Sequence, residues 1–215
     1  GNTALLLACE HGHLSIVELL LSKGANVDDK GNFSFTALHI STMNGHLSIV
    51  ELLLSKGANI DRKDYNGNTA LILACEHGHL SIVELLLSKG ANVYDRDNDE
   101  NTALILASEH GHLSIVELLL NKGATVHDKR DYGTTSIIEA TYFGHLSVVE
   151  LLLSKGANIH EKDYDRNTPL ILASRGGHLS IVELLISKGA NIHDMNSTGI
   201  TSILSASRGG HLSIV

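Results

Sequence analysis

Apolar and polar residues form blocks along the chain, and the same order of blocks returns every 33 residues. From Thr69, the apolar block TALILACEH predicts a short helix that ends at Gly78, since glycine tolerates the left-handed backbone found after helices. The next block, HLSIVELLLSKG, has apolar residues at helical spacing on one broad face and predicts a second helix that ends at Gly90. The residues that follow, ANVYDRDNDEN, are rich in Asp and Asn without a helical period, so they predict a turn or hairpin projecting from the helices.

The period does not slip anywhere in the chain. The tripeptide Gly-His-Leu begins at positions 12, 45, 78, 111, 144, 177 and 210, and a threonine keeps the same interval from position 3 to position 201. A period of this length without insertions is typical of a solenoid, in which each unit packs on its neighbours. We therefore expect a single repeat array over residues 1–215, with repeats at 3–35, 36–68, 69–101, 102–134, 135–167 and 168–200 and a partial repeat at 201–215.

The motifs inside each unit resemble those of the ankyrin repeat family. That family's opening motif, Thr-Pro-Leu-His-x-Ala, appears as TPLILA from Thr168 and as TALHIS from Thr36. Gly-His-Leu, followed by LLLSKGAN or a close variant, fills the second half of the unit, so the resemblance covers essentially the whole chain. It implies an all-α solenoid in which paired antiparallel helices stack in an arc, with β-hairpin loops perpendicular to the helices and a concave groove.

Two departures from the family pattern carry structural expectations. The motif histidine is present only at His39, and apolar packing is expected to replace its polar link at Leu6, Ile72, Ile105, Ile138, Ile171 and Leu204. The family's turn glycine is present at positions 1, 67, 133 and 199 but is replaced by Ser34, Glu100 and Arg166 in between. Because a non-glycine residue in the left-handed region costs about 1–2 kcal/mol, we expect the alternate hairpins to use a different turn.

Sequence variation is concentrated in the hairpin tips and in the last two residues of the first helix. In the ankyrin family these positions face the groove and contact partners. Seven of the eight aromatic residues lie there, and exposed aromatics are frequent binding hot spots; the alternative is that they pack on neighbouring hairpins. The strongest single candidates are Tyr132, Tyr142 and Phe143, and the full set of predicted partner-binding residues is Phe33, Phe35, Met43, Tyr65, His77, Asp99, His110, Tyr132, Tyr142, Phe143, Tyr164, Arg175 and Arg208.

Charge narrows the class of partner. A net charge of -8 and scattered Lys and Arg argue against nucleic acid, which requires a basic stripe. No apolar run approaches the length of a membrane span, so direct membrane insertion is not expected. Along the predicted groove, Glu76, Asp99, Glu109 and Asp131 are acidic and are followed by Arg166, Arg175 and Arg208, which would suit a partner with a mixed-charge segment around an apolar anchor.

Catalytic and metal-binding chemistry is not expected. Half of the 14 histidines belong to Gly-His-Leu and recur with the fold. The pairs His11/His13, His77/His79 and His110/His112 offer two ligands each, where zinc requires three or four. The acidic loop DRDNDE lacks the glycine and the final carboxylate of a calcium loop. No nucleophile motif or phosphate loop is found, so we expect no enzyme activity, no cofactor and no small-molecule substrate. Cys9 and Cys75 are too far apart for a disulfide and indicate an intracellular, reducing location such as the cytoplasm.

Three functions remain open at this point. The first is a protein-interaction scaffold that binds a partner in the groove through hairpin tips and helix ends. The second is a spacer or tether within a longer ankyrin-repeat protein, and the third is a targeting module attached to an enzyme or effector domain outside this segment. Both ends of the sequence fall inside a repeat, since GNTA matches residues 67–70 and GHLSIV matches residues 177–182, so we expect a segment of a longer array.

Overall fold

The computed structural model describes residues 2–215, which form helices joined by turns and loops. Within these residues there are 13 α-helices and two short 3-10 turns, and β-type pairing is limited to two isolated bridges, Arg96 with Thr102 and Lys129 with Thr135. The chain divides into two compact units: unit 1 ends at Ala103, and unit 2 covers Leu104–Val215. The predicted all-α repeat fold is confirmed, although the hairpins are loops with at most one bridge each; the single array with its repeat boundaries stays a prediction.

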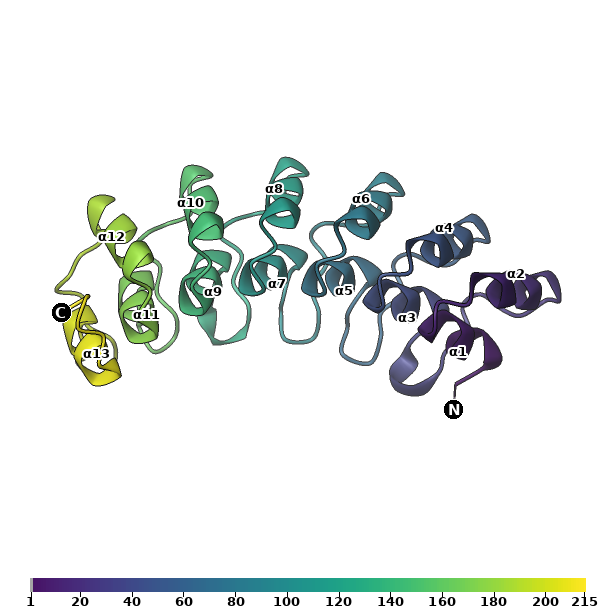
Figure 1. Ribbon diagram of the computed structural model, residues 1–215, viewed down its shortest axis with the longest axis horizontal. Coiled ribbons are helices and arrows are strands. Elements are labelled where there is room, and N and C mark those ends of the chain that lie inside the picture. Colours follow the sequence, from purple (N-terminus) through teal and green to yellow (C-terminus); the bar gives the residue numbers. More distant parts are fainter. Residues whose placement is uncertain (1) are drawn as a thin grey trace. The chain divides into compact units, whose positions relative to one another are not determined.

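Unit 1 contains three pairs of antiparallel helices, and in each pair the first helix packs on the second. In Figure 1, α2, α4 and α6 form one row, and α1, α3 and α5 form another, from which the long loops extend. Within the second row, α3 packs between α1 and α5. The bounds are α1 (Ala4–Glu10), α2 (Leu14–Ser22), α3 (Ala37–Met43), α4 (Leu47–Ser55), α5 (Ala70–Glu76) and α6 (Leu80–Ser88), with a 3-10 turn, η1, at Asn32–Ser34.

Unit 2 repeats this arrangement. Its second helices pack on one another in the order α8, α10, α12, while α11 packs between α9 and α13. The bounds are α7 (Ala103–Glu109), whose first residue belongs to unit 1, α8 (Leu113–Asn121), α9 (Ser136–Phe143), α10 (Leu146–Ser154), α11 (Pro169–Gly176), α12 (Leu179–Ser187) and α13 (Ser202–Gly209), with a 3-10 turn, η2, at Asp131–Gly133.

The first helix of each repeat is short and buried. At the start of α5, the Thr69 hydroxyl oxygen accepts a hydrogen bond from the Ile72 amide at 3.4 Å, which satisfies one of the free N–H groups of the first turn. Six of the seven residues of α5, from Ala70 to Cys75, are buried. The predicted stop is confirmed, because the helix ends just before Gly78, whose φ is +77°.

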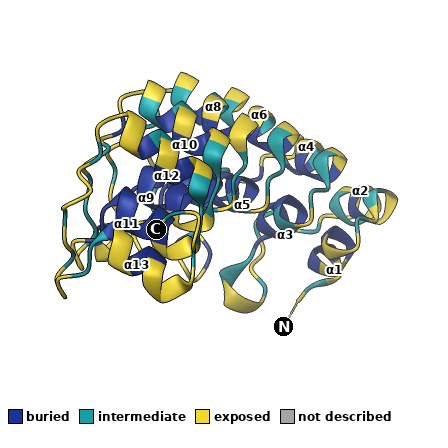
Figure 2. Cartoon of the chain, turned by 60° about the vertical axis from the view of Figure 1, so that its left-hand side comes forward, coloured by how far each residue is buried: buried dark blue, intermediate teal, exposed yellow. Residues whose placement is uncertain are grey.

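The second helix of each repeat is amphipathic, as its sequence predicts. In α6, Ile82, Val83 and Leu86 are buried, whereas the polar residues of the helix are exposed. Figure 2 shows the same division, with buried positions on the inner sides of the helices and exposed positions on the outer turns and the loops. Burying a branched aliphatic side chain contributes about 1.5–3 kcal/mol, so this apolar face holds the second helix against the first.

The histidine of Gly-His-Leu links successive repeats. Its Nε2–H donates to the backbone carbonyl near the end of the first helix in the preceding repeat, which fixes the ring tautomer and occupies an otherwise free helix-end acceptor. The bonds described within the two units are His46 to Glu10 (3.3 Å), His79 to Met43 (3.0 Å), His145 to Glu109 (2.9 Å), His178 to Tyr142 (3.1 Å) and His211 to Arg175 (3.1 Å). These histidines therefore have the structural role that their recurrence predicts.

His39 makes the polar link expected of it. Its Nδ1 accepts from the Thr36 amide at 3.1 Å and its Nε2–H donates to the Arg62 carbonyl at 3.0 Å, so the neutral ring is fully bonded. Burial lowers the pKa of His39, against the opposing effect of the Arg62 carbonyl. Apolar side chains are buried at the same place at Leu6, Ile72, Ile105, Ile138 and Ile171, but the prediction is wrong for Leu204, which lies in the last described helix, α13, and is 46% exposed.

The predicted change of turn type in alternate hairpins is wrong. Ser34, Glu100 and Arg166 have φ of +61°, +62° and +60°, in the same left-handed region as Gly67, Gly133 and Gly199 at this position of other repeats. The Glu100 amide donates to the Asp97 carbonyl at 3.2 Å, the same bond that the Gly67 amide makes with Asp64. The Arg166 amide bonds to Asp163 in the same way, and each of these hairpins, that of Ser34 included, has a bond from its first amide to the carbonyl four residues later. These hydrogen bonds favour the turn, and the non-glycine residues accept its strain.

Candidate functional site

The conformation of each hairpin tip depends on the residue that begins it. Where that residue is Asp or Asn, its side chain caps the turn: Asp64 Oδ1 accepts from the amides of Asn66 and Asn68, both at 2.8 Å, and Asp97, Asp163 and Asn196 bond in a similar way. Gly31 and Arg130 stand at this position in the two remaining hairpins and supply no such cap. In those two hairpins the tip aromatic is itself left-handed, with φ of +54° at Phe33 and +67° at Tyr132.

In unit 2, the Tyr132 hairpin and the end of α9 border an open hollow of about 460 Å³. Side chains from two hairpins and two first helices meet there. The lining residues are Arg130, Tyr132, Thr134, Ile138, Glu139, Tyr142, Phe143, Asp163, Leu172 and Arg175. Four of them, Tyr132, Tyr142, Phe143 and Arg175, are among the predicted partner-binding residues, so the structure brings the strongest sequence candidates together at one place.

The aromatic side of this hollow is ordered by ring contacts. Tyr142 and Phe143 meet edge to face with ring centres 5.0 Å apart, and Phe143 stacks on His145 at 6.4 Å. The guanidinium of Arg175 lies over the Tyr142 ring, 5.2 Å from its centre, which is within the range of a cation–π interaction. Tyr142, Phe143 and Arg175 are nevertheless exposed, so they offer rigid apolar area and one cation to solvent.

An ion-pair network underlies the Tyr132 hairpin. Arg130 Nη2 lies 2.8 Å from Glu139 Oε1 in α9, and Arg130 Nη1 lies 2.7 Å from Glu109 Oε2 in α7. The Arg130 Nε–H also donates to the Thr134 hydroxyl oxygen at 2.9 Å. One guanidinium therefore joins the hairpin to two first helices, which holds the Tyr132 hairpin at the hollow that Tyr142 also lines.

Glu139 is the unusual member of this network because it is a carboxylate with 5% of its surface exposed. Desolvation by burial raises the pKa of Glu139, while the charge of Arg130 and a hydrogen bond from Thr134 oppose that rise. Arg130 and Glu139 are not among the residues predicted from the sequence. The available signal was a departure from the repeat, since the Glu139 position holds an aliphatic residue at Leu7, Ile40, Leu73, Leu106 and Leu172.

A second hollow of about 430 Å³ adjoins the first, because Arg175 lines both. It lies between the last two hairpins and the ends of α11 and α13. The residues that line it are Asn167, Ile171, Arg175, Asn196, Thr198, Ile200, Ser205, Arg208 and Gly209, and none of them carries a carboxylate. We call the two adjoining hollows the unit-2 groove.

Unit 1 has a smaller hollow of about 230 Å³ at the corresponding side. It brings together the predicted residues Phe33, Phe35 and Met43. Phe35 contacts Phe33 and His39 edge to face, with ring centres 6.5 and 6.1 Å apart. This hollow has one aromatic pair and no arginine in its lining, so it offers less chemistry than the unit-2 groove.

The remaining predicted residues do not line these hollows. Tyr65 and Tyr164 are exposed at hairpin tips, and their amides donate to the carbonyls of Phe33 at 2.8 Å and Tyr132 at 2.9 Å. These bonds connect neighbouring tips, as the packing alternative expects, but both rings stay exposed. The others are exposed near their own helix or loop: Nδ1 of His77 and of His110 lies 3.0 Å from a carbonyl of the preceding turn, and the Asp99 amide donates to Asp97.

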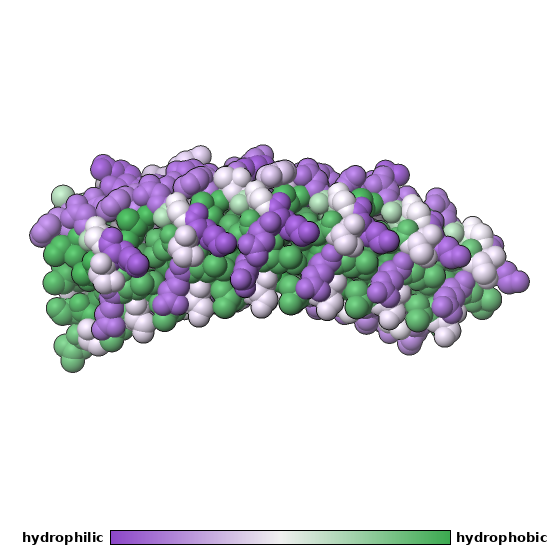
Figure 3. Space-filling view, turned by 90° about the horizontal axis from the view of Figure 1, so that it is seen from above, coloured by the Kyte–Doolittle hydropathy of each residue, from purple (hydrophilic) through white to green (hydrophobic). Residues whose placement is uncertain are grey.

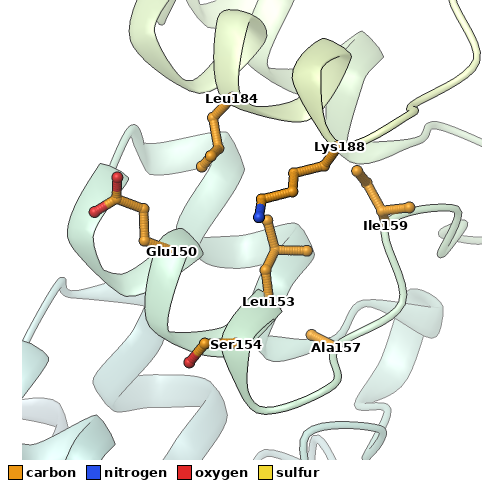
Figure 4. Close-up of a pocket in the computed structure, with 7 residues that line it drawn as sticks. All are labelled: Glu150, Leu153, Ser154, Ala157, Ile159, Leu184 and Lys188. Carbon is orange, nitrogen blue, oxygen red and sulfur yellow. The ribbon is translucent and has the colours of Figure 1, made fainter.

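Another hollow, of about 420 Å³, lies between α10 and α12 on the second-helix side of unit 2. Figure 4 shows the Lys188 amine directed toward Leu153, while the Glu150 carboxylate points away. The lining residues recur with the repeat, as Glu117, Leu120 and Lys155 do one unit earlier. A hollow built from copied positions is a property of the stack, so it is a weaker candidate for a specific site.

The second-helix side carries hydrophilic bands separated by apolar ones, and Figure 3 shows a larger apolar area at the end that holds α12 and α13. A hollow of about 400 Å³ lies there, lined by Ile186, Ile192, Ile203 and Ile214 among others. The residue at the same position two repeats earlier, Ile137, is buried. This area is therefore the stacking face of a repeat rather than a separate site.

Other chemistry is sparse in the described part of the chain. Across residues 2–215, no three His, Cys, Asp or Glu side chains are grouped to hold a metal ion, and no helix is long and apolar enough to cross a bilayer. Cys9 and Cys75 are free and buried. Burial raises the pKa of the Cys9 thiol to about 12, and it raises the pKa of Cys75 as well, so neither thiol is a ready nucleophile.

Comparison with known proteins agrees with the motif resemblance. The family model for ankyrin repeats (3 copies) matches residues 1–64, 24–97, 62–130, 95–163 and 137–215, which together span the sequence. Among solved structures, the chain is similar to the crystal structure of the human ASB11 ankyrin repeat domain, with 25% sequence identity, a TM-score of 0.88 and coverage of 99% of this chain and 98% of that one. The comparison with curated proteins gave no significant match.

Proposed function

This chain belongs to the ankyrin repeat family, and from that premise we propose that it is a non-catalytic protein-binding module whose partner docks in the unit-2 groove. Ankyrin repeats are in general protein–protein interaction modules. The observation that carries the specific proposal is the meeting of Tyr132, Tyr142, Phe143 and Arg175 around one open hollow of about 460 Å³. Aromatic and arginine side chains are the types that most often dominate binding energy.

Preorganisation supports the same surface. Tyr142 is held by Phe143 on one side and by the Arg175 guanidinium on the other, and its own carbonyl accepts from His178. The Tyr132 hairpin is joined to α7 and α9 through Arg130. A partner that binds here orders few side chains on this chain, which reduces the entropic cost of association.

An alternative function is an architectural spacer or tether. The second helices support it, because α2, α4 and α6 share the sequence LSIVELLLS and pack through copied interfaces. Copied interfaces give an extensible stack without specifying a ligand. The chain could equally serve as the targeting module of a protein with an enzyme or effector domain outside this segment, and that arrangement also uses the groove. We also propose an intracellular, reducing location, which the two free buried cysteines support.

Partner capture with matched variants distinguishes groove binding from a spacer role. The immobilised chain would be compared with the variant Tyr132→Ala, Tyr142→Ala, Phe143→Ala and with Tyr94→Ala, which removes an exposed aromatic outside the groove. Proteins retained by the wild type and by Tyr94→Ala should be lost from the triple variant, at unchanged helicity by circular dichroism. Equal retention by all three proteins would mean that the groove is not the binding surface and would favour the spacer.

A further inference from the structure

We propose that the unit-2 groove binds an extended acidic segment of the partner, with an apolar anchor against Tyr142 and Phe143 and carboxylates on Arg175 and Arg208. This inference rests on the proposed function and adds the chemistry of the segment that is bound. The occupant is a protein segment with Asp or Glu residues on one side of a bulky apolar residue.

The charge of the groove carries the proposal. Within the described residues, neither Arg175 nor Arg208 has a carboxylate within 4.0 Å, and the hollow that they share has no acidic residue in its lining. Three other cations of unit 2 are paired: Lys129 with Glu161, Arg130 with Glu109 and Glu139, and Lys162 with Asp194. In a chain of net charge -8, two adjacent unpaired arginines facing one hollow are a local positive site, which an acidic segment complements.

The first hollow provides the contact for the apolar anchor residue of the bound segment. Arg175 lies over the face of Tyr142, so its guanidinium marks the border between the aromatic hollow and the hollow that holds Arg208. A planar guanidinium stacked on a ring still has free N–H donors at its edge, and these match a carboxylate in a two-point hydrogen bond. A segment with its apolar side chain beside Tyr142 therefore places the next acidic residue at Arg175.

The repeat sets the spacing of the acidic residues. Arg175 and Arg208 occupy the same position of successive repeats, and packed helices lie about 8–10 Å apart. An extended segment of polyproline II type rises about 3.1 Å per residue and brings every third side chain to the same side, so this distance corresponds to about three residues. The expected motif is an apolar or aromatic residue followed, or preceded, by two acidic residues about three positions apart.

The experiment is a selection of displayed random peptides of about twelve residues against the wild-type chain, with variants used to sort the binders. Binders that lose affinity with Tyr142→Ala, Phe143→Ala define the groove-binding pool, and we expect this pool to be enriched in Asp and Glu at the stated spacing. Arg208→Gln should weaken such peptides about two- to fivefold, and Arg175→Gln, Arg208→Gln together about four- to 25-fold, from the usual strength of exposed ion pairs. Raising the salt concentration should weaken them further.

Two controls separate charge at the groove from charge elsewhere. Lys122→Gln removes an exposed cation after α8 that lines neither hollow, and it should leave affinity unchanged. Arg175→Glu, Arg208→Glu should reverse the selection toward basic peptides. Arg208 is the cleaner single test, because Arg175 also contacts the Tyr142 ring.

The outcomes distinguish this inference from the proposed function. A groove-binding pool without acidic enrichment, and insensitive to both arginine variants, overturns the acidic-segment inference while groove binding stands. A selection that yields no peptides dependent on Tyr142 and Phe143 overturns both. Acidic peptides that bind the Tyr142→Ala, Phe143→Ala variant as tightly as the wild type also overturn the inference, because the anchor would then have no part in recognition.

Discussion

Replacing Arg130 with Met tests the ion-pair network that positions the Tyr132 hairpin. The substitution keeps most of the apolar stem and leaves the buried Glu139 carboxylate without its cation, 2.8 Å away in the wild type. Removing one partner of a buried pair costs about 3–5 kcal/mol, and because the Arg130 side chain is 22% exposed we expect the lower end, about 3 kcal/mol. Glu139→Leu, which copies Leu106 and Leu172, should change stability by about 1 kcal/mol or less, because Arg130 keeps Glu109.

The double variant Arg130→Met, Glu139→Leu isolates the cause. It removes the charges of Arg130 and Glu139 and fills their site with apolar atoms, while the Glu109 carboxylate, whose side chain is 21% exposed, still reaches water. The stability of the double variant should therefore lie within about 1 kcal/mol of the wild type or above it. Thermal unfolding would be followed by circular dichroism. Because repeat arrays can unfold in parts, hydrogen exchange of the α9 amides would report the local opening free energy. A loss below about 1 kcal/mol in Arg130→Met, or a double variant as unstable as that single one, would refute the reasoning.

The pH dependence gives the same network a second test. The pKa of Glu139 is raised in the folded chain. Its titration therefore contributes to the free energy of unfolding fully below the pKa of the unfolded chain, about 4.3, and this contribution is lost as pH rises through the folded pKa. Without Arg130 the pKa rises further. The deficit of Arg130→Met should therefore be largest near neutral pH and shrink on acidification, whereas a deficit independent of pH would assign the effect to packing.

Three further substitutions test local features. The pKa of His39 is lowered by burial, so its neutral form stabilises the fold above about pH 6.5, and this stability is lost as pH falls through the folded pKa. His39→Leu should therefore flatten the acid side of a plot of melting temperature against pH. An unchanged acid side would contradict this. Arg166→Gly relieves a residue at φ +60° and should raise stability by about 0.5–1 kcal/mol in chemical denaturation; no gain would show the turn to be unstrained. Gly144→Ala places a Cβ 2.5 Å from the His178 ring, whereas the Cβ of Gly156→Ala meets no atom within 4 Å at a similar φ. The melting temperature should therefore fall further for Gly144→Ala. Equal decreases would mean that the contact with the histidine is unimportant.

The sequence predicted the helices because their cause is local and repeated. The apolar spacing of HLSIVELLLSKG is enough to place the buried face of α6, and the glycines at positions 78 and 90 are enough to place the ends of α5 and α6. The turn type at Glu100 could not be derived in this way. Steric preference argued for a different turn, and hydrogen bonds between hairpin residues imposed the left-handed one.

The candidate site was predicted in part. Tyr132, Tyr142 and Phe143 were found because they depart from the repeat at positions that face the groove. Arg130 and Glu139 were missed because each looks like an isolated substitution in the sequence, nine positions apart, and only the fold shows that their charges meet. Whether Arg175 and Arg208 are free or paired also depends on distances in space, which no residue pattern supplies.

Hydrogen–deuterium exchange of the chain, alone and bound to a partner recovered by the capture experiment, tests the central claim most directly. Binding in the unit-2 groove predicts slowed exchange in residues 130–144 and 163–176, with the outer second-helix face of α8, α10 and α12 unchanged. Slowed exchange confined to that outer face, with the Tyr132 hairpin and the end of α9 unaffected, would contradict the account.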